Sequence, residues 1–182
     1  MISSSLAGYC EAGTSPRVSR SMTAAPLKTA NPGEQPLDAV LRPIHEGWLA
    51  AARRYLDPAL EPGAEFWTRW AAVRYLNDEF LDRFQWERAL VGELRAFLPE
   101  DASERLRQED ARLARLRLEV DRIGRRRGTA AEVAATSRDF LEQLALWCAE
   151  IEAAAGAIPR ESLTTEGATL LAHLETADQI GP

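Results

Sequence analysis

The chain contains two similar turns, Phe97-Leu98-Pro99-Glu100 and Ala157-Ile158-Pro159-Arg160-Glu161. Each turn follows a long amphipathic run that has acidic and aromatic residues near its middle. Proline stops a helix because it lacks a backbone N–H and pushes the preceding residue out of the helical region. A long helical run that recurs with the same ending predicts two helical hairpins packed as one four-helix domain.

Length and composition favour a single helical domain. The chain has 182 residues, of which 46% are hydrophobic, so it can bury one sizeable core. Good helix formers dominate, and no segment alternates apolar and polar residues as a strand does. The net charge of −6 argues against nucleic-acid binding, and no apolar run approaches the roughly 20 residues of a membrane span. Two cysteines make no disulfide framework, which favours a cytoplasmic location.

The first 35 residues differ in composition from the rest of the chain. Residues 1–35 are rich in Ser, Ala, Thr, Pro and Gly and have few large apolar side chains, so we expect a disordered segment. The segment lacks the apolar core of a secretory signal. Its basic residues, Arg17, Arg20 and Lys28, leave a targeting role open, and Met22 is an alternative start.

Residues 36–176 are predicted to form one helical domain, followed by a tail over 177–182. A capping box at Thr129 and Glu132 marks one helix start, while Asp57-Pro58 and Gly156 mark helix ends. Because the loops are short, neighbouring helices should be antiparallel, which gives an up-down-up-down four-helix bundle with a short C-terminal fifth helix. The long helices are expected over 36–56, 64–98, 102–126 and 130–155, and the fifth carries Leu163, Leu170, Leu171 and Leu174.

Two carboxylates interrupt otherwise apolar helix faces. In the segment 64–98 the stripe that includes Phe66 and Trp70 reaches Glu87 where its spacing calls for an apolar residue. Glu87 is either a boundary glutamate paired with an arginine or a buried carboxylate kept for a function, since burying a lone charge is costly. Asp110 interrupts the next stripe near a helix start, where the helix dipole reduces that cost.

This layout resembles the hemerythrin-like family, also called the HHE cation-binding family. The stretch Leu41-Arg42-Pro43-Ile44-His45-Glu46 is similar to the family's opening helix with its early histidine. Glu109-Asp110-Ala111-Arg112-Leu113 is similar to the third-helix element, with Asp110 where the family usually has histidine. The resemblance covers residues 37–174 and implies a four-helix bundle that holds two irons with imidazoles and bridging carboxylates.

The chain departs from the family at most ligand positions. Aligned on Leu98-Pro99, the second-helix pair His-x-x-x-Glu becomes Ala89 and Glu93, and one turn earlier it becomes Gln85 and Ala89. Aligned on Ile158-Pro159, the fourth-helix pair becomes Ala149 and Ala153, whereas one residue earlier it becomes Cys148 and Glu152. In every register most of the histidines are missing.

Two classes of function follow from the resemblance and its departures. The first is a bundle without metal, neither catalyst nor cofactor carrier, that acts on a protein partner or by self-association. The second is a divergent iron site for oxygen, redox or metal sensing, for which iron suits the imidazole and carboxylate ligands. The residues available to that site are His45, Glu87 or Glu93, Asp110, Cys148 and Glu152.

Each singled-out side chain also has a purely structural interpretation. Cys148 is then a small buried hydrophobe, and His45 is a histidine at the edge of the core, hydrogen-bonded to a neighbour. The five tryptophans mostly fill the core, while an exposed aromatic such as Trp67 or Trp86 carries any partner binding.

Overall fold

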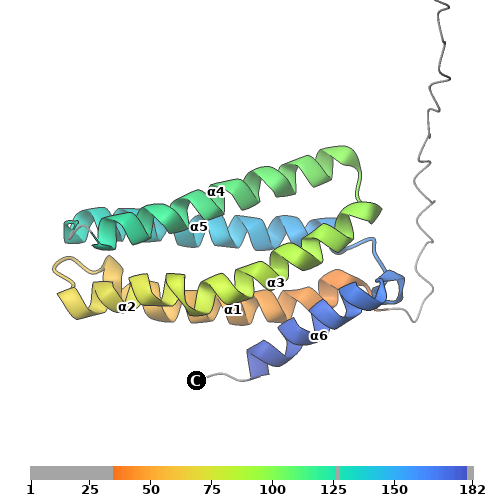
Figure 1. Cartoon of the computed structure of the whole chain (residues 1–182), viewed down its shortest axis with the longest axis horizontal. Coiled ribbons are helices and arrows are strands. Elements are labelled where there is room, and N and C mark those ends of the chain that lie inside the picture. The colour runs from red at the N-terminus through yellow and green to blue at the C-terminus, as the bar shows by residue number, and fades with distance from the viewer. Residues whose placement is uncertain (1–34, 126–127, 180–182) are drawn as a thin grey trace, which may run out of the picture.

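The computed structural model describes residues 35–125 and 128–179, and these residues form an all-α protein (Figure 1). The predicted all-α class is confirmed for them, and neither stretch contains a strand. The predicted disordered segment lies outside the described residues except for Gln35. The elements are α1 (Leu37–Leu60), α2 (Phe66–Asn77), α3 (Glu79–Leu94), the 3-10 turn η1 (Arg95–Phe97), α4 (Glu100–Arg125), α5 (Ala130–Ala155), the 3-10 turn η2 (Arg160–Ser162) and α6 (Thr165–Gln179).

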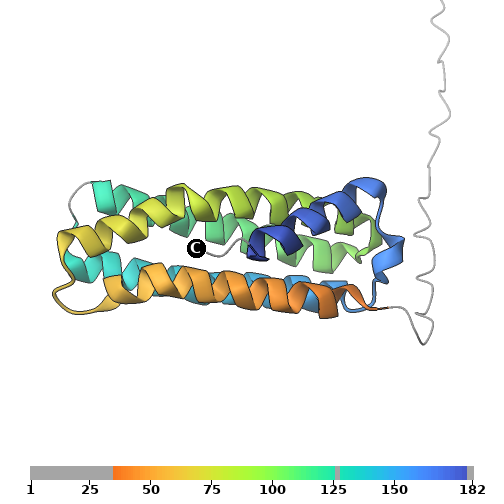
Figure 2. The same ribbon diagram turned by 90° about the horizontal axis from the view of Figure 1, so that it is seen from below.

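The long helices lie side by side in two layers. Figure 1 shows α4 and α5 on one side of the molecule and α1, α2 and α3 on the other. Helix α5 packs against both α1 and α4, and α2 contacts α1, α3 and α4. Helix α6 crosses the outer face of α3 and α1 in the half of the molecule away from α2 (Figure 2).

The two proline turns meet at one end of the molecule. Phe97, Leu98 and Pro99 line a cavity of about 280 Å³ together with Ala157 and Ile158. The start of α1 joins them there, because the N–H of Leu37 donates to the carbonyl oxygen of Ile158 at 3.0 Å and Pro36 pairs with Pro159. The two proline turns and the start of α1 therefore lie next to one another at this end of the molecule.

The predicted end of the first helix at Asp57-Pro58 is wrong. Helix α1 contains both Pro43 and Pro58 and continues to Leu60. Each proline is exposed, so the carbonyl group left without its N–H partner faces water. Ala59 is fully buried, and its packing holds the last turn in place.

The predicted helix over 64–98 is divided into α2 and α3. At Asp78, between them, the backbone departs from ideal helix angles, with φ −102° and ψ −77°. The side chain of Asn77 donates to the carbonyl oxygen of Val73 at 3.0 Å and to Asp121 of α4 at 2.7 Å. A side chain that bonds the backbone of the preceding turn competes with the helix, and its contact with α4 favours a break at this point.

The helix starts depend on threonine caps. The predicted capping box of Thr129 and Glu132 is present at the start of α5, whose predicted bounds, 130–155, are confirmed. Thr164 caps α6 by accepting from the N–H of Gly167 at 3.0 Å. Helix α6 continues to Gln179, into the segment predicted as a tail.

The core contains an aromatic cluster shared by α1, α3 and α5. Trp48 stacks on Phe80 with ring centroids 5.1 Å apart and meets Trp147 edge-on at 5.9 Å. Phe140 and Phe84 extend the cluster. Such pairs add about 0.5–1.5 kcal/mol each beyond the burial of apolar area, so this cluster fixes the spacing of the three helices.

Candidate functional site

A buried polar cluster brings together side chains from α1, α3 and α5. His45 of α1 is 1% exposed, and its Nδ1 donates to Oε1 of Glu152 of α5 at 2.7 Å. Its Nε2 lies 3.6 Å from Oε2 of Glu87 of α3, which is 0% exposed. One imidazole thus lies between two carboxylates from different helices, deep in the protein.

The surroundings favour the charged form of the imidazole. Burial alone lowers the pKa of His45, but the hydrogen bond with Glu152 and the nearby Glu87 carboxylate outweigh it and raise the pKa to about 9. The same hydrogen bond lowers the pKa of Glu152, which also lies 3.6 Å from Nε of Arg42. His45 and Arg42 therefore both lie within 4 Å of the Glu152 carboxylate, and His45 also faces Glu87.

Cys148 lies on α5 one turn before Glu152 and is 2% exposed. Burial raises the pKa of its thiol well above the usual range, and the charges of Glu87 and Glu152 raise it further. A thiol of this kind stays protonated, so it is neither a good nucleophile nor a ready thiolate ligand. Arg83 closes the cluster on the α3 side, donating to the carbonyl oxygen of Ile44 at 2.5 Å and lying over the Trp48 ring.

The structure gives two other predicted ligands different partners. Glu93 accepts from the hydroxyl of Thr164 at 2.6 Å, on the surface where α6 begins. Asp110 lies 2.8 Å from Nε of Arg88, an ion pair between α4 and α3. The predicted set of His45, Glu93, Asp110, Cys148 and Glu152 is therefore only partly assembled: His45, Glu152 and Cys148 gather around Glu87.

The interpretation of Glu87 as a boundary glutamate paired with an arginine is wrong. It is completely buried, and among the described residues neither of its oxygens nor Nε2 of His45 has a hydrogen-bond partner. Its position in the apolar stripe of α3 was the signal that singled it out. Burial is the alternative that the structure supports.

The gathered donors do not fit a two-iron centre. Nδ1 of His45 is engaged by Glu152, which leaves one imidazole nitrogen and one carboxylate facing each other. Among the side chains that the structure describes, those of residues 35–123 and 128–177, no group of three or more His, Cys, Asp and Glu is arranged to hold a metal ion. Two irons need several imidazoles and bridging carboxylates, which this donor set does not supply.

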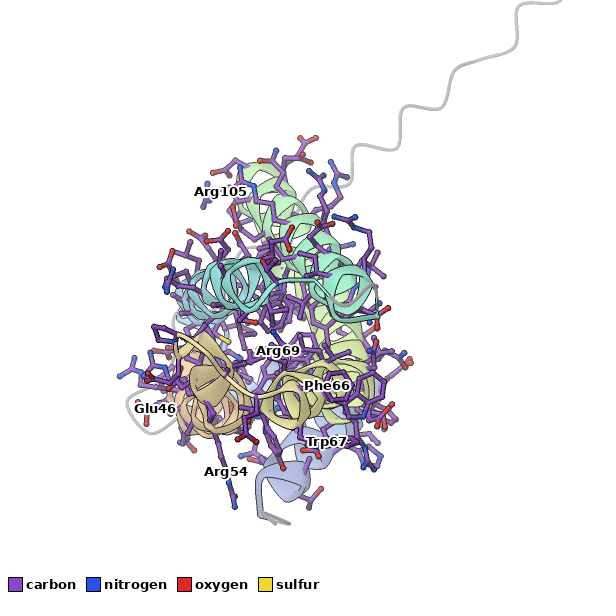
Figure 3. The ribbon with its side chains drawn as sticks, turned by 90° about the vertical axis from the view of Figure 1, so that its left-hand side faces the viewer. Glu46, Arg54, Phe66, Trp67, Arg69 and Arg105 are labelled. Atoms are coloured by element: carbon purple, nitrogen blue, oxygen red, sulfur yellow. The ribbon has the colours of Figure 1, made fainter. Side chains whose placement is uncertain are left out.

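A second candidate site is an exposed group of rings on α2. Phe66, Trp67 and Trp70 are 49%, 71% and 44% exposed, and we call them the α2 aromatic patch. Phe66 stacks on Trp70 at 6.4 Å and meets Trp67 edge-on at 5.1 Å. Figure 3 shows Phe66 and Trp67 together at the end of the molecule where α2 begins.

Sequence analysis missed most of this patch. The stripe analysis placed Phe66 and Trp70 in the core, where they are not, and only Trp67 was expected at the surface. A cavity of about 400 Å³ adjoins the patch between α2 and α4, lined by Trp70, Arg74 and Asp121 among others. Trp86 of α3 is also exposed, but it stacks on His173 of α6 at 4.8 Å and is partly occupied by that contact.

Comparison of the chain with protein-family models, with curated proteins and with solved structures gives no match. Among the described helices none is both long enough and apolar enough to cross a bilayer.

Stability should depend on pH through His45. The folded protein holds the His45 proton to about pH 9, whereas an unfolded chain releases it near 6.5. The stabilisation is therefore complete below about pH 6.5 and is lost as the pH rises to 9, at no more than about 1.4 kcal/mol per pH unit. Urea unfolding from pH 6 to 9.5 measures this change in the free energy of unfolding. His45→Gln is the reference, because Cys148 titrates in both proteins and its contribution cancels in the difference. Parallel curves for the two proteins would contradict this assignment.

Removing one member of the cluster should cost more than removing both. His45→Leu leaves Glu87 buried beside an apolar side chain, so the free energy of unfolding should fall by about 3–5 kcal/mol. His45→Leu combined with Glu87→Leu should recover most of that loss, because no buried charge remains. Chemical denaturation followed by circular dichroism measures both. Glu46→Leu, at an exposed position on the same helix as His45, is the control, with a change below about 0.5 kcal/mol expected. Glu87→Leu is measured alone as well, and a double variant as unstable as the sum of the two single variants would show that the side chains do not interact.

Proposed function

We propose that this chain is a hemerythrin-like up-down-up-down four-helix bundle that has lost the two-iron site and acts as a non-catalytic interaction module. The carrying observation is the α2 aromatic patch, three exposed rings within one turn and a half of helix. Large exposed aromatic groups that contact each other are typical of surfaces that another molecule covers.

The contacts of the buried cluster support the same conclusion. His45 lies between Glu87 and Glu152, and Asp110 lies beside Arg88. In these arrangements charged side chains join helices to one another, which is a structural task. Protonated His45 places a positive charge beside both carboxylates, as a metal ion does in hemerythrin-like sites.

A partner should contact residue 67 and leave the opposite side of the molecule free. A photo-reactive amino acid replaces Trp67 in one protein and Glu46 in a control, and both proteins are irradiated in the organism that encodes them. Glu46 is exposed on α1 and lies across the molecule from the patch (Figure 3). We expect a cross-linked product from position 67 that is absent from position 46. Equal labelling at both positions, or none at either, would contradict an interaction role for the patch.

A divergent iron-binding protein is the second candidate. It rests on one observation, the 3.6 Å approach of two buried atoms without hydrogen-bond partners among the described residues, Nε2 of His45 and Oε2 of Glu87. A neutral imidazole there could ligate a metal ion together with the carboxylate.

Elemental analysis separates the two candidates. The protein is produced in iron-supplemented medium without a metal-binding tag, alongside Glu87→Gln. The interaction module predicts well under 0.1 iron per chain in both proteins after dialysis. Stoichiometric iron in the natural protein that Glu87→Gln abolishes would favour the second candidate and overturn the first.

A further inference from the structure

The exposed face of α2 has an aromatic half and a cationic half. Phe66 lies four residues before Trp70, and Arg74 lies four residues after it, so the three side chains share one face of the helix. All three are exposed, with the Arg74 side chain at 76%. Its charge is balanced by Asp78 in an exposed ion pair of 3.2 Å, which is weak in water.

This face is complementary to itself when it is turned by 180°. Phe66 and Arg74 of one helix are eight residues apart, roughly 12 Å at 1.5 Å per residue, so they cannot meet within one chain. In two antiparallel copies that cross at Trp70, each Arg74 comes over Phe66 of the other copy. A guanidinium is attracted to the face of an aromatic ring, and the pair occurs twice in a symmetric dimer.

The position of α2 leaves room for such a contact. Helix α6 covers α3 and α1 in the other half of the molecule and does not extend over α2 (Figure 1). Two copies can therefore approach along α2 without displacing α6.

We infer that a second copy of this chain docks on the α2 aromatic patch, with the two α2 helices antiparallel and crossing at Trp70. The inference rests on the proposed function, because it names the occupant of the same surface. The contact joins two short helices between chains that each carry a net charge of −6, so the dimer should be weak, with a dissociation constant on the order of 10–100 µM.

Sedimentation velocity of the full chain from about 1 to 500 µM tests the dimer. We expect the mass to rise from one chain to two with concentration. Trp70→Ser should weaken association at least tenfold and Arg74→Ala several-fold. Trp86→Ser is the matched control, since Trp70 and Trp86 are both 44% exposed and Trp86 lies outside the patch. Its dimer should be as strong as that of the natural protein. A monomer at every concentration, or equal loss with Trp86→Ser, would overturn the inference.

Cysteine cross-linking tests the orientation in a Cys10→Ser background, where Cys148 is buried. Mild oxidation of Phe66→Cys mixed with Arg74→Cys should give a disulfide-linked pair, because the antiparallel crossing brings these positions together. Each variant alone should give little, and a strong product from either alone would overturn the antiparallel arrangement.

The two proposals can fail separately. A protein that stays monomeric but cross-links to a different protein from residue 67 keeps the interaction role and loses the second copy as occupant. A protein that stays monomeric and forms no product at residue 67 loses both.

Discussion

The rest of this structure depends on the interaction of the charged His45 ring with Glu87 and Glu152. The imidazole is buried between Glu87 and Glu152, so the helices α1, α3 and α5 meet around one charged ring. A buried carboxylate without a positive neighbour would cost several kcal/mol, and the imidazolium offsets part of that cost. The aromatic cluster of Trp48, Phe80 and Trp147 packs around the same three helices and fixes their spacing, while the charged cluster fixes which residues face one another.

In our proposal the helical bundle is retained, while its interior side chains contact one another and do not hold two irons. In the proposed hemerythrin-like bundle acidic and imidazole side chains meet in the interior, and here His45 is hydrogen-bonded to Glu152 and lies 3.6 Å from Glu87. What remains available to other molecules is the outer surface, and there α2 presents three aromatic rings and an arginine along one face. The function we propose therefore depends on side chains that lie outside the core.

Much of the fold could be predicted from local signals. The bounds of α5 follow from the Thr129–Glu132 capping box and from Gly156, both of which act within a few residues of the chain. The division between α2 and α3 could not be predicted in this way, because Asn77 breaks the helix through contacts with α4, which depend on tertiary structure. The continuation of α1 past Pro58 depends likewise on the burial of Ala59.

The candidate site could be predicted only in part, because some of its contacts are local in the sequence and others depend on tertiary structure. Helical periodicity singled out Glu87, and the alignment shifted by one residue placed Glu152 on the inner face of its helix. The ion pair of Asp110 with Arg88 and the hydrogen bond of Glu93 with Thr164 join distant parts of the chain, so the sequence could not show that these carboxylates have other partners. The exposure of Phe66 and Trp70 was missed because an apolar stripe does not reveal which of its members a neighbouring helix covers.

The measurement that tests the central claim most directly is a pH titration of His45 by proton–nitrogen NMR. The chain has two histidines, so His45→Gln assigns the signals without ambiguity. Our account predicts that both ring nitrogens of His45 carry a proton at pH 7 and that the ring titrates with a pKa of about 9. A ring that is neutral at pH 7, with a pKa at or below roughly 6.5, would show that the helices do not meet around a charged imidazole and would contradict the account.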